Sequence, residues 1–358
     1  MHFILIMKIS FMLPGLIKIP IGGVKIVYCY AEELTKLGHK VSIISPIRES
    51  TNFYHLAKAG AIKLRDYYHN VDNKPYYKIP PDVEHHIVPL PNTKYVPDGD
   101  VIIATGWQTA CWVDGFSEVK GEKFYFIQNY ETYLCNEKVI NHTWKLPLKK
   151  IVIAQWLKQT AKKMGESVYG PIPNAIDPNE FYITKSIEDR STKMSMLYHR
   201  LPIKAAQDGI SVLKKMREIN PNLEATIYSS RPPHIKIPDW ITLEIRPDTD
   251  RLREIYNASA IFLHHSHQEG WPLPPAESMM CGCAVIAVAN EGVQEYITHN
   301  ESGLLSPIGD VEALINNIQF LLDNLGERIR IAETGHERIN EFLWEKSAKQ
   351  LEEILMQP

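Results

Sequence analysis

Short apolar segments alternate with helix-length amphipathic segments along this chain, and the alternation occurs twice. Strands that are separated by helices in a sequence form parallel, doubly wound sheets. The pattern therefore predicts an α/β protein with two Rossmann-like doubly wound domains that face a central cleft, with ligands at the carboxyl ends of the strands. The expected strands lie at 4–13, 41–45, 86–90, 101–105, 124–128 and 151–154, and then at 194–198, 223–228, 241–245, 261–265 and 284–288.

A segment that is rich in glycine and proline at Gly170 and then polar up to Lys193 separates the two alternations. With 358 residues, the chain is longer than one compact domain usually is. We therefore expect a first domain at 1–172 and a second at 173–340. The first 172 residues hold 21 Lys and Arg against 15 Asp and Glu, and the rest hold 18 against 27, which suggests that the domains face different ligands.

Two adjacent glycines, Gly22 and Gly23, follow the first expected strand and open a helical segment. Paired glycines let the backbone approach a ligand, and the N–H groups of a helix N-terminus face anionic oxygens. A tight strand-to-helix turn without a ligand explains the pair equally well. The chain has no Gly-x-Gly-x-x-Gly motif, which argues against a nicotinamide or flavin enzyme.

Two glutamates eight residues apart, Glu269 and Glu277, flank a turn rich in glycine and proline after the expected strand 261–265. We expect Glu269 at the mouth of the cleft and Glu277 in the first turn of the following helix. Carboxylates in these places can accept hydrogen bonds from the vicinal hydroxyls of ribose or hexose rings. For Glu277 the alternative is a simple favourable interaction with the helix dipole.

Two cations, Arg200 and Lys204, follow the expected strand 194–198 at the start of the next helical segment. Arginine with its planar fork and lysine as a point charge can together clamp a diphosphate. On spacing alone, a solvated basic face explains the pair better. The pair gains significance only in combination with the other motifs.

In this order, the motifs resemble glycosyltransferase family 4, whose members are retaining enzymes of the GT-B fold that use sugar nucleotides. The likeness covers nearly the whole chain and is weakest at about 50–120. The segment 123–131 is further similar to the rhamnosyltransferase-like branch. Other matching segments are Leu37-Gly38-His39-Lys40-Val41, Pro173-Asn174-Ala175-Ile176-Asp177, Gly303-Leu304-Leu305, 307–314 and Phe342-Leu343-Trp344-Glu345.

The resemblance implies that the second domain binds the donor. Arg200 and Lys204 would neutralise the donor diphosphate, and Glu269 would face the hydroxyls of the donor sugar. These three are therefore the expected catalytic residues. Glu277 would hold the ribose.

The same resemblance places further donor contacts on the backbone. N–H groups at Gly270 and Trp271 would meet the sugar or phosphate, and Gly22 and Gly23 would leave room for the donor phosphate and the acceptor. In this family the departing phosphate deprotonates the acceptor hydroxyl, so no protein base, metal or cofactor is expected. The final helix, at 341–358, is expected to pack back on the first domain.

The chain departs from the family pattern at several positions. His199 and Ala205 stand where the family usually has glycine, and Pro272 removes one N–H from the sugar-facing turn. Many members have a histidine after the strand that ends near Thr105, where this chain has Trp107. Trp107 is therefore a candidate for stacking on the acceptor sugar.

Histidines and cysteines of the zinc-binding type occur close together in the second half. Their spacing fits no standard zinc site, so ordinary reduced thiols are the favoured interpretation. The residues are His264, His265, His267, Cys281 and Cys283.

The segment from Lys145 to Lys163 holds six lysines and no acidic residue. One hypothesis is a patch that contacts anionic lipid or an anionic acceptor. A solvated face is the favoured alternative.

Composition excludes several classes of protein. A net charge of -3 argues against a nucleic-acid binder, and no apolar run approaches the roughly 20 residues of a spanning helix. Lys8 interrupts the N-terminal apolar run, so we expect a buried strand there rather than a signal peptide, with Met7 as an alternative start to Met1. Five cysteines without a secretion signal predict reduced thiols in a cytoplasmic protein, with peripheral contact at the inner membrane face as an option.

The expected function is a retaining, hexosyltransferase-type glycosyltransferase. It would move a sugar from a nucleoside-diphosphate sugar, dTDP-rhamnose or a UDP-sugar, to a hydroxyl of a glycan or lipid-linked acceptor in surface polysaccharide or glycoconjugate synthesis. Two alternatives remain: a non-catalytic subunit that binds a sugar nucleotide, and a GT-B sugar-nucleotide epimerase.

Overall fold

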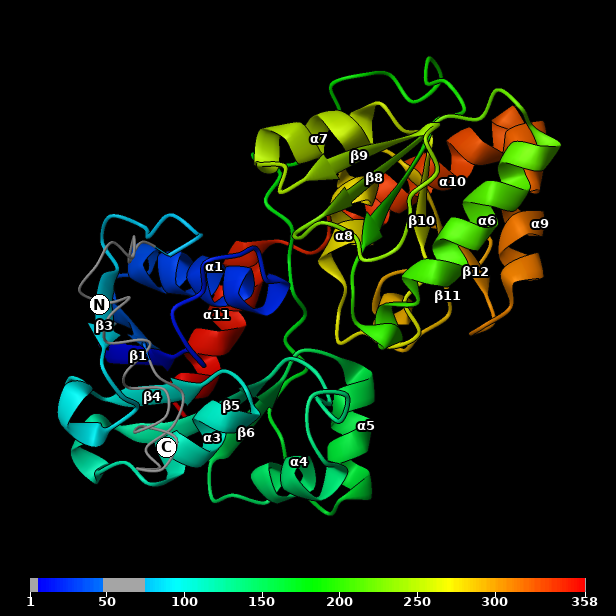
Figure 1. The fold of residues 1–358 in the computed structure, drawn as a ribbon. Helices are drawn as coiled ribbons and strands as arrows, with labels where there is room; N and C mark the ends of the chain where they lie inside the picture. Colours follow the sequence, from blue (N-terminus) through cyan, green and yellow to red (C-terminus); the bar gives the residue numbers. More distant parts are fainter. Residues whose placement is uncertain (1–5, 48–74, 358) are drawn as a thin grey trace, which may run out of the picture. The chain divides into compact units, whose positions relative to one another are not determined.

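The structure, a computed structural model, describes residues 6–47 and 75–357. The chain divides into two compact units, one made of Met1–Ile172 with Ala348–Pro358 and the other of Pro173–Ser347. Over the described residues, each unit holds a six-stranded sheet with helices packed on it (Figure 1). Residues 4 and 5 of the first expected strand, and Met1, lie outside the described residues.

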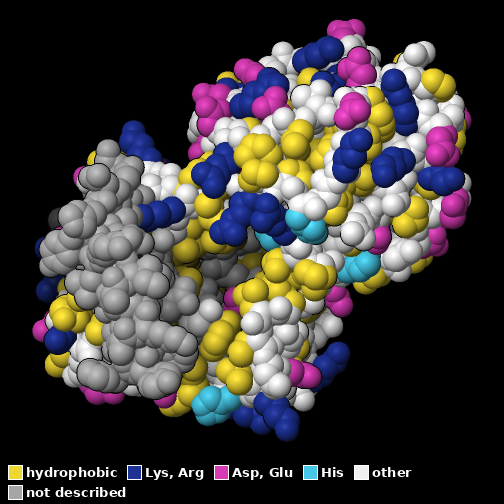
Figure 2. Space-filling model, viewed as in Figure 1, with side chains coloured by type: hydrophobic (Ala, Val, Ile, Leu, Met, Phe, Trp, Pro, Cys, Tyr) yellow, Lys and Arg dark blue, Asp and Glu magenta, His cyan; other side chains and the backbone are white. Residues whose placement is uncertain are grey.

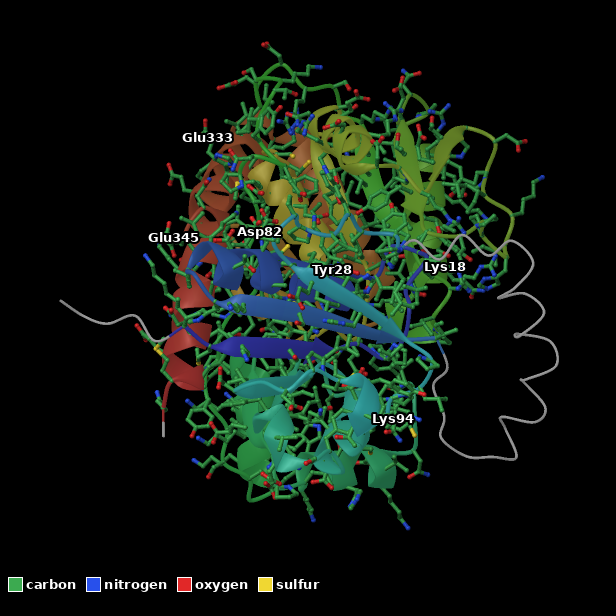
Figure 3. All side chains as sticks on the ribbon, turned by 90° about the vertical axis from the view of Figure 1, so that its left-hand side faces the viewer. Lys18, Tyr28, Asp82, Lys94, Glu333 and Glu345 are labelled. Carbon is green, nitrogen blue, oxygen red and sulfur yellow. The ribbon has the colours of Figure 1, made fainter. Side chains whose placement is uncertain are left out.

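The sheet of the first unit is parallel, with the strand order β3-β2-β1-β4-β5-β6. Ile9 in β1 is paired with Val41 in β2 on one side and with Val101 in β4 on the other (the strands run side by side in Figure 3). The strands are β1 (Lys8–Met12), β2 (Lys40–Pro46), β3 (Glu84–Val88), β4 (Val101–Ala104), β5 (Glu122–Ile127) and β6 (Lys149–Val152). The described helices are α1 (Gly22–Lys36), α3 (Trp107–Asp114), α4 (Glu137–Trp144) and α5 (Gln155–Lys163).

The second unit has a parallel sheet in the order β12-β11-β10-β7-β8-β9. Its strands are β7 (Met194–Tyr198), β8 (Ala225–Ser229), β9 (Ile241–Ile245), β10 (Ile261–His264), β11 (Ala284–Val288) and β12 (Leu304–Ser306). Its helices are α6 (Ala206–Ile219), α7 (Thr249–Asn257), α8 (Leu273–Met280), α9 (Val311–Asp323) and α10 (Leu325–Ile339). Helices α6 and α9 lie side by side, and α8 contacts both α7 and α10 (Figure 1).

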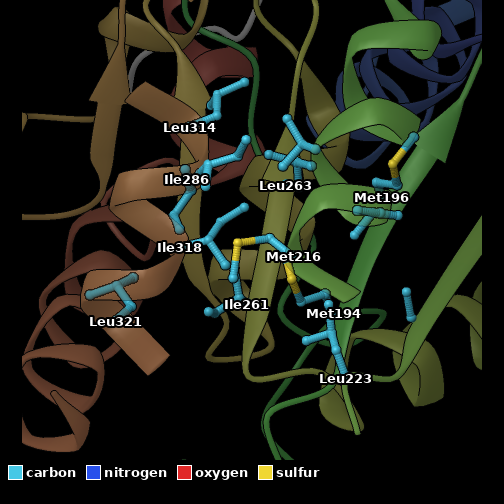
Figure 4. Packing of buried hydrophobic residues seen from close by; sticks show 14 of the residues in the cluster. Met194, Met196, Met216, Leu223, Ile261, Leu263, Ile286, Leu314, Ile318 and Leu321 are labelled. Carbon is cyan, nitrogen blue, oxygen red and sulfur yellow. The ribbon is translucent and has the colours of Figure 1, made fainter. Parts of the chain in front are cut away.

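Buried aliphatic and methionine side chains form the core of this second unit. All five residues of β11 are buried, as expected for a central parallel strand covered on both faces. Met216 of α6 and Ile318 of α9 reach toward Ile261 of β10 in the packing seen in Figure 4. Apolar side chains of the two neighbouring helices α6 and α9 thus pack against the sheet.

Basic and acidic side chains are interspersed on the face of the second unit seen in Figure 2. The second unit, residues 173–347, holds 25 Asp and Glu against 17 Lys and Arg. On the visible face, this negative balance does not gather into a single acidic patch.

The two sheets have the same strand order. In the first sheet, successive strands are added on one side of β1 up to β3 and on its other side from β4 onward. In the second sheet, they are added on one side of β7 up to β9 and on its other side from β10 onward. Each sheet therefore has a topological switch point, where ligands of doubly wound proteins bind at the carboxyl ends of the strands. The α/β prediction with two doubly wound sheets is confirmed.

Two details differ from the sequence-based expectations. The helix expected from Lys204 begins at Ala206, because Ala205 adopts a left-handed conformation (φ 45°, ψ 39°) after the short 3-10 turn Pro202–Lys204. The segment expected as a linker is packed against the second unit, where the buried guanidinium of Arg190 donates hydrogen bonds to the carbonyls of Ser259 (3.2 Å) and Cys281 (2.5 Å).

The last helix, α11 (Trp344–Leu355), begins in the second unit and ends in the first. In the first unit, the Nε2 atom of buried His39 lies 2.8 Å from a carboxylate oxygen of Glu352. His39 Nδ1 accepts a hydrogen bond from the N–H of Met7 at 3.2 Å, so Nε2 carries the proton that Glu352 accepts. Among the described residues, no helix is both long and apolar enough to cross a bilayer.

Candidate functional site

Lys204 and Glu269 meet at the switch point of the second sheet. Lys204 follows β7 and Glu269 follows β10, and these strands are neighbours, so their carboxyl ends lie together. The Lys204 Nζ atom is 2.6 Å from Glu269 Oε2, and both side chains are largely buried. Burial alone would raise the pKa of Glu269, but the positive charge of Lys204, with hydrogen bonds from Lys204 and Ser266, holds it below its ordinary value.

His265 fixes the backbone that carries Lys204. Its ring nitrogens lie 2.6 Å from the Lys204 carbonyl and 3.0 Å from the Leu197 carbonyl, so the ring bridges β7 and the Lys204 turn. Gly209 makes this possible, since a Cβ there would lie 2.4 Å from the His265 ring. Sequence analysis missed this positioning role, because the two residues that His265 bridges are more than 60 positions away.

The histidines and cysteines of the second unit have separate partners. His267 pairs with Asp208 at 3.0 Å, and Cys283 Sγ donates to the Tyr256 carbonyl at 3.1 Å. Burial lowers the pKa of His264 to about 3, which keeps its imidazole neutral. Within the described residues, no three His, Cys, Asp or Glu side chains are grouped as metal ligands would be.

Arg200, expected to act with Lys204, has a different partner. Its guanidinium is exposed and donates hydrogen bonds to the Pro232 carbonyl, with Nε at 3.0 Å. The structure therefore brings Lys204 to Glu269 but binds Arg200 to a loop carbonyl.

Glu277 lies in the second turn of α8, because the helix begins at Leu273, so the placement in the first turn was wrong. The dipole interaction fades beyond the first turn, which removes that alternative. Its buried carboxylate instead accepts a hydrogen bond from Tyr256 at 3.2 Å. The hydroxyl of Tyr256 is also 2.6 Å from that of Tyr228, so a buried tyrosine pair orients Glu277.

The turn between the two glutamates is held by aromatic packing. The buried Trp271 ring lies 4.5 Å from the Tyr296 ring and 5.7 Å from the Phe342 ring, measured between centroids. The Tyr296 hydroxyl also donates to the Pro272 carbonyl at 2.7 Å. The Trp271 side chain therefore has a packing role that the sequence did not reveal.

Gly292 is a further residue of this turn that sequence reasoning missed. A Cβ at Gly292 would lie 2.7 Å from the carbonyl oxygen of Glu269 and 2.8 Å from that of Gly270. Only glycine lets this backbone pass so close, so Gly292 helps to set the position of Glu269.

In the first unit, α1 begins at Gly22, as predicted. The Gly23 carbonyl accepts a hydrogen bond from Gln128 Nε2 at 3.0 Å, and a Cβ at Gly23 would lie 3.2 Å from Gln128 Oε1. The hydroxyl of Tyr77 bonds both the N–H and the carbonyl of Ile21 at 2.9 Å. The glycine pair thus begins a helix that two side chains from elsewhere hold in place.

Trp107 begins α3, directly after β4, and its backbone N–H donates to Glu131 Oε2 at 3.0 Å. Burial raises the pKa of Glu131 to about 7. Sequence analysis did not select Glu131, although it lies within the segment 123–131 that resembles the rhamnosyltransferase-like branch. Its position shortly after an expected strand was the available signal.

The six lysines at 145–163 do not form one continuous basic face. Three have partners within the first unit: Lys149 with Glu122 (2.6 Å), Lys150 with Glu166 (3.0 Å) and Lys158 with the Gly170 carbonyl (2.8 Å). The exposed remainder is Lys145, Lys162 and Lys163.

Parts of this chain are similar to known proteins. Residues 241–338 match the family model of glycosyl transferases group 1. The second unit therefore carries a group 1 glycosyl transferase domain. Among curated proteins, 56% of this chain is 26% identical to the exopolysaccharide phosphotransferase SCO2592 of Streptomyces coelicolor, and 31% of it is 31% identical to the D-inositol 3-phosphate glycosyltransferase of Corynebacterium urealyticum. The aligned parts cover 22% and 26% of these two relatives, about a quarter of their length.

Solved structures resemble the chain over nearly its full length. HepE of Anabaena in complex with UDP-glucose matches with a TM-score of 0.76 at 16% identity, covering 98% of this chain and 99% of that one. The sucrose-phosphate synthase of Thermosynechococcus elongatus matches with a TM-score of 0.71 at 17% identity, covering 97% and 98%. These matches confirm the predicted GT-B fold class around the group 1 domain.

Proposed function

We propose that this protein is a retaining glycosyltransferase that transfers a sugar from a nucleoside-diphosphate sugar to a hydroxyl of a glycan or lipid-linked acceptor. The observation that carries the proposal is the Lys204–Glu269 pair at the switch point of the second sheet. Part of this sheet lies within the residues that match group 1 glycosyl transferases. The expected role of such an enzyme is in surface polysaccharide or glycoconjugate synthesis.

The chemistry of the pair suits a departing diphosphate. Negative charge gathers on this leaving group as the glycosidic bond breaks, so a fixed cation that interacts more strongly with it then lowers the barrier. A lysine ammonium has three N–H donors, and Glu269 occupies one, so Lys204 retains donors for a phosphate oxygen. The guanidinium of Arg200 adds a second positive charge, and with these cations we expect no metal or other cofactor.

Glu269 and Glu277 supply acceptors for hydroxyl groups. Glu269 is ionised at neutral pH because its pKa is lowered, and it can accept hydrogen bonds from the donor sugar. Glu277, held by Tyr256, is proposed to bind the ribose, and the donor is a UDP-sugar or dTDP-rhamnose.

Peripheral contact with anionic lipid at the inner membrane face is proposed for the exposed lysines Lys145, Lys162 and Lys163. The variant with Lys145, Lys162 and Lys163 changed to Gln should lose salt-sensitive sedimentation with acidic vesicles. Sedimentation equal to wild type would contradict this part of the proposal.

The test is thermal unfolding with a panel of UDP-, dTDP-, GDP- and ADP-sugars on wild type, Lys204→Met and Lys215→Met. A donor at about 100 times its Kd should stabilise wild type by roughly 2.7 kcal/mol. Lys204→Met should lose this stabilisation, whereas Lys215→Met, which removes an exposed lysine of α6, should keep it.

Product analysis separates the alternatives. Transfer to a hydroxyl acceptor supports the proposal, an isomerised sugar nucleotide indicates an epimerase, and donor binding without product indicates a non-catalytic subunit. Absence of stabilisation by every nucleotide in the panel would contradict the donor site itself.

A further inference from the structure

His199 lies at the switch point of the second sheet, between β7 and the turn that carries Lys204. It directly follows Tyr198, the last residue of β7, and it stands where the family pattern has glycine. Its half-buried ring is close enough to Lys204, Glu269 and Arg231 to interact electrostatically with all three. The ring therefore belongs to the surroundings of the Lys204–Glu269 pair, although the proposed function assigns it no role.

One nitrogen of the His199 ring already has a partner. Nδ1 accepts a hydrogen bond from the backbone N–H of Leu201 at 3.1 Å. An imidazolium donates from both nitrogens, so this bond requires the neutral ring, whose proton is then on Nε2. Burial, with the positive charges of Lys204 and Arg231, lowers the pKa of His199, whereas the charge of Glu269 opposes this change. At neutral pH, His199 therefore presents one N–H donor, at Nε2.

The Nε2 N–H of His199 is not used by the protein. Over residues 6–47 and 75–357, no oxygen accepts a hydrogen bond from it, and it is not among the buried polar atoms that are closed off from the surface. Both ring nitrogens of His265, by contrast, lie close to backbone carbonyls. His265 is therefore saturated by the fold, whereas His199 keeps a donor that a ligand can reach.

Arg231 brings a cation to the same place from the next strand. It follows β8, which is paired with β7. On one side of it Arg246 donates to the Ser230 carbonyl, and on the other side Arg200 donates to the Pro232 carbonyl, each at 3.0 Å. Within the described residues, no carboxylate forms an ion pair with the Arg231 guanidinium. The loop is therefore held in place while the charge of Arg231 is not neutralised by the protein.

These donors suit an anion with several acceptor oxygens. Lys204 retains N–H donors beside its bond to Glu269, Arg231 has a guanidinium, and His199 adds one N–H. Two positive charges and one negative charge face the His199 ring, so the balance favours an anion over a neutral hydroxyl group. A diphosphate has acceptor oxygens on two phosphorus atoms, which matches donors that come from two neighbouring strands.

We propose that His199 is a further catalytic residue, which donates a hydrogen bond from Nε2 to a phosphate oxygen of the nucleoside-diphosphate donor. The inference rests on the proposed function, since it adds a residue to the same donor site. When the bond between sugar and phosphate breaks, its electron pair passes to the phosphate, and a donor fixed by its bond to Leu201 stabilises this charge without moving. His199 keeps its proton throughout, and its neutral ring adds no repulsion to Lys204 and Arg231.

The alternative role for His199 is to shape its turn through the bond between Nδ1 and Leu201. Two substitutions separate this role from a contact with phosphate. In His199→Asn, the side-chain oxygen can still accept the Leu201 N–H, but the shorter side chain has no donor at the place of Nε2. In His199→Gln, the amide nitrogen reaches about as far as Nε2 and restores the donor.

The experiment titrates the full chain, labelled with nitrogen-15 histidine, with UDP, dTDP, GDP and ADP and with the four corresponding nucleosides. At least one diphosphate should shift the Nε2 signal of His199, which is assigned with His199→Gln. His199→Asn should raise the Kd of that diphosphate about tenfold, or 1.4 kcal/mol, but leave the Kd of its nucleoside unchanged. His199→Gln should recover most of the loss.

His299→Asn is the matched control. The Nδ1 atom of His299 also accepts a backbone N–H, from Leu305 at 2.9 Å, but His299 precedes β12 and thus lies toward the amino ends of the strands. This variant should bind the diphosphate and its nucleoside like wild type. The change in His199→Asn is then due to the place of the ring and not to the loss of a histidine.

The inference fails if a diphosphate binds wild type without a shift of the His199 Nε2 signal. It also fails if His199→Asn binds this diphosphate like wild type, or weakens the nucleoside as much as the diphosphate, since a distorted turn would affect both. In each of these cases the donor site itself remains. If no diphosphate binds wild type, the proposed function fails together with the inference.

Discussion

The two sheets share one strand order, yet the carboxylate near each switch point has opposite surroundings. In the second unit, Glu269 pairs with Lys204 at 2.6 Å, and its pKa lies below the ordinary value. In the first unit, Glu131 accepts a backbone N–H, and burial raises its pKa to about 7. The same fold thus presents a charged pair at one edge and a carboxyl group without a cation at the other.

This difference shows which properties come from topology and which from individual residues. Strand order decides where a ligand can bind, because it decides where the carboxyl ends of two strands leave a crevice. The side chains that follow those strands decide the charge of the ligand. A cation at the edge favours a diphosphate, and a lone carboxylate favours neutral hydroxyl groups.

Replacement of Lys204 should leave Glu269 without a cation, as Glu131 is in the first unit. Lys204→Met leaves Glu269 buried without a partner, and we expect a loss of about 3 kcal/mol in unfolding free energy at neutral pH. Because a lowered pKa stabilises the fold above the unfolded pKa and this benefit disappears as pH falls, the deficit should shrink in acid. Urea unfolding across pH measures it.

A double variant is the control for Lys204→Met. Adding Glu269→Gln removes the buried charge and should recover most of the lost stability. A double variant as unstable as Lys204→Met would show that packing of the lysine stem, not its charge, makes the difference.

Neutralisation of Glu131, the carboxylate of the first unit, should raise the free energy of unfolding, whereas the loss of Lys204 lowers it. The pKa of Glu131 is raised from 4.5 to about 7, so the folded state resists its ionisation and stability falls as pH rises through this window. Glu131→Gln should therefore be more stable than wild type by about 3 kcal/mol near pH 8 and nearly equal to it near pH 4. Chemical unfolding at both pH values checks this, and a gain that is independent of pH would contradict it.

An alanine substitution at one glycine near each switch point tests how closely the backbone is packed there. Gly292→Ala places a Cβ 2.7 Å from the Glu269 carbonyl oxygen, so the turn must shift, at a cost of about 2 kcal/mol. Gly106→Ala meets only ordinary contacts in an extended backbone (φ -168°) and should cost less than about 1 kcal/mol. Thermal unfolding measures both variants. Equal losses of stability in Gly292→Ala and Gly106→Ala would contradict this prediction.

The smallest effect concerns the turn that carries Lys204. Ala205 has φ 45°, a region that glycine adopts more readily, so Ala205→Gly should stabilise the protein by about 0.5 kcal/mol. Ala206→Gly, one residue later and inside α6, should instead destabilise it by roughly 0.5 to 1 kcal/mol. A destabilised Ala205→Gly variant would mean that the turn relies on the alanine side chain.

The alternation of strands and helices was predictable because the apolar periodicity of the sequence is strong. Strands β7 and β11 have the bounds that the apolar runs indicated. Lys204 and Glu269 were both selected, since each follows a strand, and the resemblance supplied their roles. Their direct pairing was not predicted, because 65 residues separate them and only the strand order brings them together.

The remaining parts depend on burial and on distant contacts. His265 resembled a metal ligand in sequence, but its partners are two backbone carbonyls, which no motif encodes. Glu131 was not selected from the sequence, because its contact with Trp107 and its burial depend on residues distant in the chain. Glu277 was placed one turn too early, because a sequence with Pro274 and Pro275 locates a helix start only within a residue or two.

The helix α11 has a consequence for the order in which the chain is synthesised. Domains generally fold as they emerge from the ribosome, the N-terminal one first. The first unit, however, takes its last core side chains, Leu351 and Leu355, and the partner of its buried His39, Glu352, from the final helix. The unit that is synthesised first is therefore the one completed last, and its exposed core positions must wait while the whole second unit is translated.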